Sequence, residues 1–404
     1  MRIAIATAVY YPQINGVAMF SYNLAIGLAA RGHEVIVLCP SQTGKQHTKT
    51  VNGVKVCYLK SMQLKLYPDQ IHDTAKGRKI FYEHGFRVSV FPGKEIDEVL
   101  KGFGPDVVHV QVSDPIGLAV VKWARRAGIP VVTTEHNQPE VLTDPIHLPG
   151  IVKGIANKVL ASYFRNRQKK SDFATMPTKQ AIDGLFFATG QKLDVPVAAV
   201  SNGVDLSRFK PGVATKSIYK KYNLKQDVQT VLYIGRVDPE KKVGVVVEAF
   251  LQAEVPGAQL VIVGDGVDKA RLERKYSSHT AVKFLGRVVG DDLRELYKVG
   301  TVFATASEIE TQGIVLIEAA ACGLPLIAVD AGAVAEVCVD GENGYLCEPG
   351  SSAEIASAMR KILLDEKLRA KFSKKSIEIA KEHDFETTLD RFINIYQRVI
   401  DNKK

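Results

Sequence analysis

The chain has 404 residues, of which 46% are apolar, and this is enough to build more than one domain with its own core. Its net charge is +9, since Lys and Arg outnumber Asp and Glu by 26 to 16 up to Gly212, whereas the remainder has 27 against 28. No apolar run approaches the roughly 20 residues of a membrane-spanning helix, and the N-terminus lacks the features of a signal peptide, so we expect a cytoplasmic protein.

Short apolar segments alternate with amphipathic segments along most of the chain. This pattern is typical of buried parallel strands that are connected by helices on both faces of a sheet, and it predicts an α/β fold. We expect strands at residues 2–8, 33–40, 106–112, 129–136, 230–235, 259–264, 281–286 and 301–306, and helices at 20–30, 117–128, 243–253 and 293–299.

The chain divides at residues 200–217, where a strand is followed by Asn-Gly turn residues, a proline and polar residues. We place the boundary at Pro211, which gives domains of residues 1–211 and 212–382. Residues 383–404 form an amphipathic helix whose apolar side chains, Leu389, Phe392, Ile393 and Tyr396, need a surface to cover. We expect this helix to return to the first domain.

The loops that follow the predicted strands are the candidate sites, because ligands of parallel sheets bind beyond the carboxyl ends of the strands. After the first strand, Asn15-Gly16 lets the backbone approach a ligand just before a helix whose first amides favour an anion. After residues 230–235, Arg236 and Lys241 place two cations that can hold a diphosphate, with surface solvation as the alternative.

Two glutamates stand seven residues apart in the segment 307–329. A helix that starts near Gly313 would direct its free amides into the same pocket, with Glu310 in the preceding loop and Glu318 about a turn and a half inside the helix. Either glutamate alone would be explained by the helix dipole. Together with the following Gly-Leu-Pro and buried strand, they favour a site that binds both anions and hydroxyl groups.

These motifs, taken in order, resemble glycosyltransferase family 4, whose members are retaining enzymes with the GT-B fold. The resemblance covers nearly the whole chain and is carried by INGVA and RGHEV, NGVD and FKP within residues 202–211, GRVDPEK at 235–241, VGDG at 263–266, and the pair Glu310 and Glu318. It implies two Rossmann-like domains that face each other across a cleft. The first would bind the acceptor and the second a nucleotide-sugar donor.

The resemblance also implies roles for individual residues. Arg236 and Lys241 would bind the donor diphosphate, Glu310 the hydroxyl groups of the transferred sugar, and Glu318 the ribose. The phosphates would be approached by Gly16 and by the amides of Gly313, Ile314 and Val315.

Two histidines end strands in the first domain. His136 stands where the family has a histidine beside the reacting sugar, although the partner that follows it is Asn137 rather than Thr or Asp. A structural histidine that caps the loop is the alternative. His109 also ends a strand, and we expect it to pack in the core.

The implied reaction is front-face transfer of a hexose with retention of configuration, in which cations stabilise the leaving diphosphate. The sequence has no Asp-x-Asp loop, so we expect no metal and no cofactor. As the donor, we expect a UDP-sugar rather than a GDP-sugar. The five cysteines form no CxxC pair and no cluster with histidine, and we expect them to be buried and free. A nucleotide-sugar epimerase of the same fold is the alternative enzyme.

The acceptor is expected to be a lipid. ETQG at residues 310–313 and YYPQINGVA at 10–18 resemble bacterial enzymes that glycosylate diacylglycerol or phosphatidylinositol lipids. The alternative is a soluble acceptor. The basic first half could also meet nucleic acid, but we expect none, because the chain contains no recognised binding module.

A basic amphipathic helix is predicted at residues 151–170. It has apolar side chains along one side and the cations Lys158, Arg165, Lys169 and Lys170 elsewhere, which is typical of a helix that lies on an anionic membrane. The enzyme would then be peripheral on the inner face of the cell membrane. The alternative is that the apolar side of this helix packs on the first domain's sheet. The sequence does not predict the oligomeric state.

Overall fold

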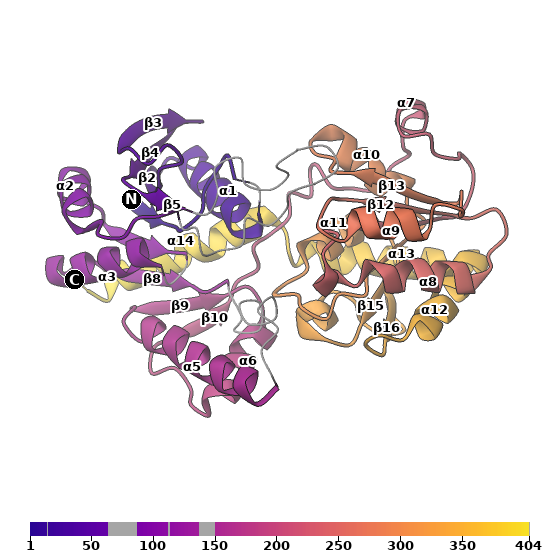
Figure 1. Cartoon of the computed structure of the whole chain (residues 1–404). Coiled ribbons are helices and arrows are strands. Elements are labelled where there is room, and N and C mark those ends of the chain that lie inside the picture. Colours follow the sequence, from indigo (N-terminus) through magenta and orange to yellow (C-terminus); the bar gives the residue numbers. More distant parts are fainter. Residues whose placement is uncertain (14, 64–86, 112–113, 137–149, 404) are drawn as a thin grey trace. The chain divides into compact units, whose positions relative to one another are not determined.

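The structure is a computed structural model that describes residues 1–13, 15–63, 87–111, 114–136 and 150–403, and these form two compact units (Figure 1). Unit 1 contains the described residues up to Asn202 together with the chain from Thr388 onward. Unit 2 contains Gly203–Thr387. The division falls nine residues before the predicted boundary because Leu206 and Phe209 pack against the core of unit 2.

Unit 1 is built on an eight-stranded sheet with the strand order β10-β9-β8-β7-β1-β2-β4-β3. All neighbouring strands are parallel except β3, which forms an antiparallel hairpin with β4 at the edge. The strands are β1 (Arg2–Ala6), β2 (Glu34–Pro40), β3 (His47–Val51), β4 (Val54–Leu59), β7 (Val107–Val110), β8 (Val131–Thr134), β9 (Phe173–Met176) and β10 (Val197–Ala199), and a separate pair is formed by β5 (Met62–Gln63) and β6 (Arg87–Val88).

Helices connect the strands of unit 1, as the apolar periodicity predicts. They are α1 (Gly16–Ala30), α2 (Gly93–Phe103), α3 (Pro115–Ala127), α5 (Gly150–Gln168) and α6 (Lys179–Thr189), and α14 (Phe385–Asp401) joins this unit from the end of the chain. Helix α1 begins four residues before the predicted start, because Asn15 caps it: its Oδ1 accepts a hydrogen bond from the Ala18 amide at 2.9 Å. The cap leaves Gly16 as the first helical residue.

Helix α14 completes the core of unit 1 although it comes from the end of the sequence. Leu389, Phe392 and Tyr396 are buried, as predicted, whereas Ile393 is half-buried. The Phe392 ring lies 5.1 Å from the ring of His109. The chain thus passes between the units twice. The two connecting segments, around Val204 and around His383, are hydrogen-bonded to each other. The Val204 amide donates to the His383 carbonyl at 2.8 Å, and the Thr388 hydroxyl donates to the Ser201 carbonyl at 3.0 Å.

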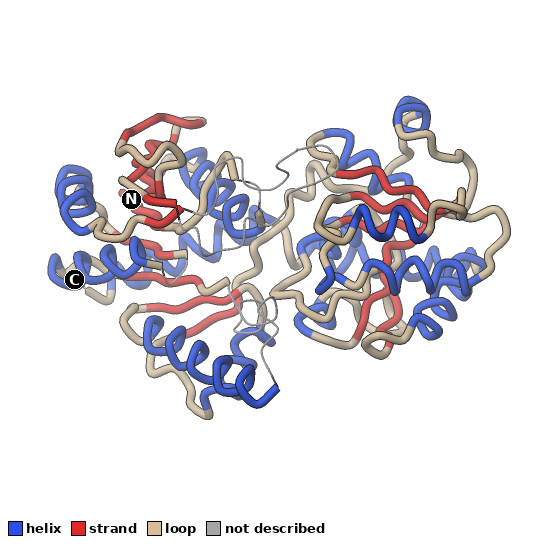
Figure 2. The backbone as a smooth tube through the Cα atoms, in the orientation of Figure 1, coloured by secondary structure: helices blue, strands red, loops and turns tan. Residues whose placement is uncertain are grey.

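Unit 2 is built on a six-stranded parallel sheet with the order β13-β12-β11-β14-β15-β16. Its strands are β11 (Thr230–Ile234), β12 (Gln259–Val263), β13 (Val282–Gly286), β14 (Val302–Ala304), β15 (Leu326–Val329) and β16 (Gly344–Cys347). The order reverses between β11 and β14, as in the doubly wound sheets of dinucleotide-binding domains. Each unit is thus a Rossmann-like layer structure with its strands between helices (Figure 2).

Both faces of the unit 2 sheet are covered by helices. Val231 and Tyr233 of β11 belong to one buried cluster, whereas Leu232 and Ile234, which point to the opposite face, belong to another. The helices are α7 (Lys216–Lys221), α8 (Val243–Ala253), α9 (Lys269–Lys275), α10 (Asp291–Val299), α11 (Ile314–Ala321), α12 (Ser352–Leu364) and α13 (Glu366–Lys381), with short 3-10 turns η2 (Pro239–Lys241) and η3 (Gly332–Glu336).

The VGDG motif is explained by close packing of two loops. The loop after β12 runs against the loop after β11, and a side chain on Gly264 would place its Cβ 1.7 Å from the carbonyl oxygen of Gly235. A Cβ on Gly266 would lie 2.3 Å from the Val237 carbonyl oxygen. Glycine at both positions therefore lets the second loop support the segment that carries Arg236.

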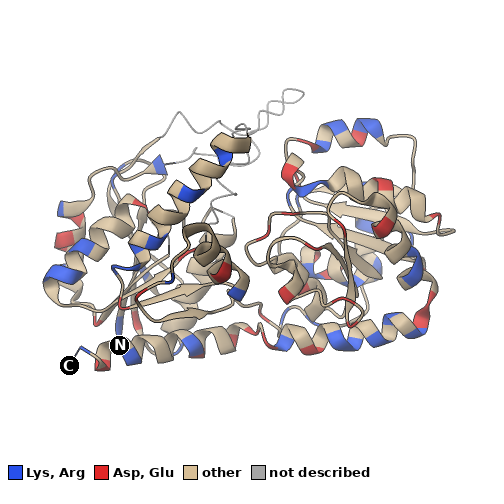
Figure 3. Ribbon diagram, turned by 90° about the horizontal axis from the view of Figure 1, so that it is seen from below, with Lys and Arg blue, Asp and Glu red and all other residues tan. Residues whose placement is uncertain are grey.

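All five cysteines are free and buried, as the sequence predicts. Lys and Arg are spread over several elements rather than gathered on one (Figure 3). Among the described residues, no helix is long and apolar enough to cross a membrane.

Candidate active site

The polar loops of unit 2 lie at the point where its strand order reverses. The loop after β11 carries Arg236 and Lys241, and the loop after β14 carries Ser307 and Glu310. Because β11 and β14 are paired neighbours, their carboxyl ends bring these two loops together. Helices leave from adjacent strands on opposite faces of the sheet at such a point, which opens a crevice for a ligand.

Lys241 and Glu310 form the centre of this loop pair. The Lys241 ammonium donates to Glu310 Oε1 at 2.7 Å, to the Ile309 carbonyl at 3.1 Å and to the Ser307 hydroxyl at 3.3 Å. Only 15% of the Lys241 side chain and 18% of the Glu310 side chain are exposed. The structure thus brings together two residues that the sequence places 69 positions apart.

The backbone of Glu310 is held by a turn that the sequence does not single out. The Ala333 amide donates to the Glu310 carbonyl at 3.1 Å, and Gly332 has a left-handed φ of +60°. A Cβ at Gly332 would lie 3.1 Å from the Glu310 carbonyl oxygen and 3.2 Å from its amide nitrogen. The position of this carboxylate therefore depends on a close backbone approach by η3.

Arg236 lies in the same loop but faces its own acidic neighbours. Its guanidinium pairs with Asp238 and, at 2.6 Å, with Glu240, and 46% of its side chain is exposed. The buried Tyr233 hydroxyl donates to the Arg236 carbonyl at 2.6 Å, which fixes the backbone at this point. The guanidinium is thus accessible, and it is held by carboxylates that an incoming diphosphate would have to replace.

Glu318 lies inside helix α11, with its carboxylate against a tyrosine from α10. The Tyr297 hydroxyl donates to Glu318 Oε2 at 2.5 Å. Burial raises the pKa of the Glu318 carboxyl to about 7, and the hydrogen bond from Tyr297 opposes part of that rise. This carboxyl is therefore partly protonated near neutral pH and can both donate and accept hydrogen bonds.

Helix α11 starts where the sequence predicts. Gly313 is its N-cap with a left-handed φ of +72°, and the first intrahelical bond runs from the Leu316 amide to the Gly313 carbonyl at 2.9 Å. Ile314 and Val315 therefore provide first-turn amides, which favour an anion. The predicted donor-binding residues of unit 2 thus lie in the loop after β11, in the loop before α11 and within α11, and a hydrogen bond joins the first two segments through Lys241 and Glu310.

In unit 1, His136 is buried at the end of β8. Its Nε2 lies 2.9 Å from Gln111 Oε1, and its ring lies 5.2 Å from the ring of Phe20 in α1. Burial lowers the pKa of His136 to about 3, so its imidazole is neutral. Gly16 is exposed at the first turn of α1, with nothing within 4 Å of an added Cβ, so a ligand can approach its backbone. Asn137 lies outside the described residues.

His109 is fully buried, as expected for a core residue. Its ring nitrogens lie 2.7 Å from the hydroxyl oxygens of Tyr396 and Thr134. Sequence reasoning missed Gln111, Tyr297 and Ser307, which hold His136, Glu318 and Lys241 in place. Gln111 follows β7 directly in the structure, but the strand predicted at residues 106–112 includes it, so the sequence did not single it out as a residue beyond a strand end.

The four cations predicted for the membrane side have different environments in helix α5 and after it. Lys158 and Lys170 are exposed, and Lys169 pairs with Asp194 at 2.7 Å. Arg165 is buried, and its guanidinium donates to the Lys192 carbonyl at 2.9 and 3.2 Å. The structure thus places Arg165 inside unit 1, where it links α5 to the segment after α6, because the following turn of the helix packs inward.

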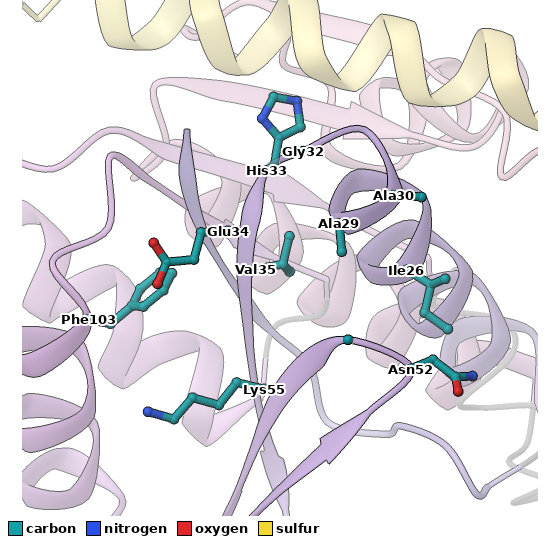
Figure 4. Close-up of a pocket in the computed structure, with 11 residues that line it drawn as sticks. Ile26, Ala29, Ala30, Gly32, His33, Glu34, Val35, Asn52, Lys55 and Phe103 are labelled. Atoms are coloured by element: carbon teal, nitrogen blue, oxygen red, sulfur yellow. The ribbon is translucent and has the colours of Figure 1, made fainter.

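A hollow of about 640 Å³ lies elsewhere in unit 1, between the last turns of α1 and the start of β2 and β4. Ile26 and Ala29 of α1 line one side, and Glu34, Lys55 and Phe103 line the other (Figure 4). These strands begin here, so the hollow is at the amino edge of the sheet. It is separate from Gly16, Gln111 and His136, which follow the carboxyl ends of their strands.

Within the part of the chain that the structure describes, no group of three or more His, Cys, Asp and Glu side chains is arranged to hold a metal ion. The charged groups of the candidate site are Arg236, Lys241, Glu310 and Glu318, and these are suited to binding phosphates and sugar hydroxyl groups.

Comparison with known proteins agrees with this arrangement. Alpha-monoglucosyldiacylglycerol synthase of Acholeplasma laidlawii is 28% identical over 361 residues, which cover 85% of this chain and 84% of that protein. The GDP-mannose-dependent alpha-mannosyltransferase of Mycobacterium tuberculosis is 28% identical over 355 residues, covering 87% and 84%. Anabaena HepE, solved in complex with UDP-glucose, has a similar fold, with a TM-score of 0.70 at 18% identity over 98% of this chain and 100% of that one.

Two family models match consecutive parts of the chain. "Glycosyltransferase Family 4" matches residues 14–208, and "Glycosyl transferases group 1" matches residues 215–379. With two Rossmann-like units and charged loops at a strand-order reversal, these matches define a glycosyltransferase of the GT-B type. The chain belongs to glycosyltransferase family 4, which confirms the prediction from its motifs.

Proposed function

We propose that this glycosyltransferase transfers a hexose, with retention and without a metal, from a nucleotide-diphosphate sugar to a membrane glycerolipid such as 1,2-diacylglycerol. UDP-glucose is the proposed donor, in preference to GDP-mannose. The observation that carries the acceptor assignment is the apolar row of helix α5. Ile151, Ile155 and Val159 follow each other at intervals of four residues and are 84%, 60% and 63% exposed.

An exposed apolar row of this kind is unusual on a helix in water. Val152 and Tyr163 extend it, while Ala161 and Phe164 face the core, so α5 buries one side and presents apolar side chains on another. Lys158 is exposed beside Val159. Exposed apolar side chains next to Lys are typical of helices that insert into the interface of an anionic bilayer.

The relatives support the same assignment. Two of the similar proteins are named alpha-monoglucosyldiacylglycerol synthase, from Acholeplasma laidlawii and Streptococcus pneumoniae, at 28% and 27% identity. The fold relative HepE binds UDP-glucose. A mannosyltransferase dependent on GDP-mannose is equally similar in sequence, so the donor has to be tested directly.

The chemistry that we propose for unit 2 combines its contacts with the roles that the family resemblance implies. Lys241 and Arg236 would stabilise the negative charge that develops on the leaving diphosphate, a role that a metal ion fills elsewhere. Glu310 would then exchange its bond with Lys241 for hydroxyl groups of the transferred sugar, and Glu318 would bind the ribose. First-turn amides at Ile314 and Val315 would approach the phosphates. For Gly16 and His136 of unit 1 we propose the roles that the family resemblance implies.

The test is an activity assay with purified protein. UDP-glucose and GDP-mannose are each supplied with and without vesicles that contain diacylglycerol, in the presence of EDTA, and released nucleotide and glycolipid are quantified. We expect nucleotide release only with UDP-glucose and diacylglycerol, and an α-linked product, which retains the anomeric configuration of the donor. An isomerised nucleotide-sugar would indicate an epimerase, and release that depends on a soluble alcohol would overturn the lipid acceptor.

Membrane binding is tested separately by vesicle flotation at low and high salt. We expect the protein to float with anionic vesicles, and the double variant Ile155→Glu/Val159→Glu to lose this binding. Val213→Glu is the matched control, because Val213 is 92% exposed in unit 2, away from α5 in sequence. Equal flotation of both variants, or no flotation of the wild type, would contradict the role of α5.

A further inference from the structure

His136 belongs to a buried group of polar side chains in unit 1. Gln111 lies between the two histidine rings, with Oε1 2.9 Å from His136 Nε2 and Nε2 3.2 and 3.3 Å from the ring nitrogens of His109. Thr134 continues the group toward Thr175, with 2.6 Å between their hydroxyl oxygens. Gln111, His109 and Thr175 have no exposed surface, so their hydrogen bonds are not replaced by bulk water.

The sheet register places Gln111 beside His136. Strands β7 and β8 are parallel neighbours, with Val110 opposite Thr133, so the residues that follow the two strands leave the sheet side by side. The Gln111 amide donates to the Ala6 carbonyl at 2.9 Å, and the Glu135 amide donates to the Thr175 carbonyl at 3.0 Å. Backbone bonds on both sides thus fix the two side chains relative to each other.

The contacts of Gln111 determine which way its amide points. Both ring nitrogens of His109 already have hydroxyl partners at 2.7 Å, and the Gln111 nitrogen is almost equally distant from the two nitrogens. That nitrogen therefore lies over the ring face, which attracts an N–H group and repels a carbonyl oxygen. The Gln111 oxygen is left to face His136, where it can only accept a hydrogen bond.

The imidazole of His136 is neutral because burial disfavours its charged form. A neutral imidazole carries one N–H and one lone pair, and the partner of one nitrogen decides which nitrogen has the proton. Since Gln111 Oε1 accepts from Nε2, the proton of His136 is on Nε2. Nδ1 then carries the lone pair.

We propose that Gln111 is a positioning residue, which holds His136 in the Nε2–H form so that Nδ1 is the acceptor for a substrate hydroxyl hydrogen. This inference rests on the proposed function, in which His136 acts beside the transferred sugar. The substrate group that it selects is a hydroxyl donor. A donor sugar that carries an ether or fluorine at that position would therefore be used poorly.

The proposal is tested by NMR of protein with ¹⁵N-labelled histidine and by steady-state kinetics. We expect long-range ¹H–¹⁵N correlations of the His136 ring, assigned by their loss in His136→Asn, to show the Nε2–H form in the wild type. Gln111→Met keeps the shape of the side chain and removes the acceptor. It should lose this fixed form and lower kcat roughly 100-fold, the effect of a misplaced group, with donor KM within about twofold.

Tyr396→Phe is the matched control, because it removes a hydroxyl from the same buried group but contacts His109 rather than His136. It should lower the melting temperature, keep the Nε2–H form and keep kcat within about threefold of the wild type. Equal loss of kcat in both variants would overturn a positioning role for Gln111 in favour of a general effect on packing.

An Nδ1–H form of His136 in the wild type would overturn the proposal, even if the Gln111→Met variant failed to fold. Failure of the proposed function has a different signature. If the wild type transfers no sugar but shows the Nε2–H form that is lost in Gln111→Met, the positioning of His136 by Gln111 is supported and its role in transfer is refuted.

Discussion

Replacement of Lys241 by Met tests the centre of the candidate site. The substitution keeps the aliphatic stem and removes the ammonium, so Glu310 loses its partner at 2.7 Å. Removing one member of a buried ion pair costs about 3–5 kcal/mol, and an exposed pair contributes about 0–1 kcal/mol. With 15% and 18% of the two side chains exposed, this pair is close to the buried case, and we expect a loss of about 2–3 kcal/mol.

A loss of this size should lower the melting temperature of unit 2 by about 5–10 °C, because about 1 kcal/mol corresponds to about 2–4 °C in a unit of this length. The effect on catalysis should be larger. If the ammonium stabilises the leaving diphosphate, kcat/KM should fall about 100- to 1,000-fold. Both quantities are measured on the full chain, by calorimetry and by glycolipid formation below the melting transition.

The neighbouring lysine supplies a matched control. Lys242 pairs with Glu308 and comes from the same loop, but 36% and 31% of these side chains are exposed. Lys242→Met should cost less than about 1 kcal/mol and change kcat/KM less than about threefold. The reasoning is refuted if Lys241→Met transfers sugar as fast as Lys242→Met. The double variant Lys241→Met/Glu310→Gln should recover stability but not transfer, since the uncompensated carboxylate is gone while the cation is still missing.

Three further changes probe other parts of the structure. Because burial raises the pKa of Glu318 from 4.5 to about 7, the folded state holds a proton that the unfolded state releases, so the contribution of Glu318 to stability should fall as pH rises from about 4.5 to about 7, whereas buried His136 and His109, with pKa values lowered to about 3, contribute in the opposite direction; the contribution of Glu318 is the difference between the denaturation curves of the wild type and Glu318→Gln across that range. Arg165→Ala should cost about 1–3 kcal/mol in urea unfolding, because two bonds to the Lys192 carbonyl are lost, but vesicle binding should not change. Gly264→Ala should abolish soluble expression or lower the melting temperature sharply, since its Cβ would overlap the Gly235 carbonyl; a fully stable variant would contradict the loop packing.

The sequence alone predicted the alternation of strands and helices and the motif residues, because both depend on local patterns. The predicted strand at residues 230–235 is β11, and Gly313 is the cap of α11. The side chains that position the site could not be predicted. Gln111 contacts His136 only because β7 and β8 are neighbours in the sheet. The periodicity of apolar residues predicts individual strands but not their order in the sheet.

Helix α5 shows where a pattern was insufficient. Its composition predicted a basic amphipathic helix, but the four cations were treated as equivalent. Arg165 is buried while Lys158 is exposed, because the last turns of the helix face the segment around Lys192. The spacing of charges along a helix predicts which residues lie on the same side of it. Which side is exposed to solvent depends on the segments that pack against the helix.

The place of α14 in unit 1 has a consequence for biosynthesis. Phe392 and Tyr396 close over His109, and these residues are synthesised about 190 positions after β10, the last strand of the same sheet. Until they emerge from the ribosome, the apolar residues of unit 1 that α14 covers are exposed in the growing chain. Unit 2 ends at Thr387, so all of its residues are synthesised before unit 1 is complete. A fragment that stops at Asn202 should therefore bind a chaperone or aggregate, and adding a peptide of residues 385–403 in trans should restore its solubility.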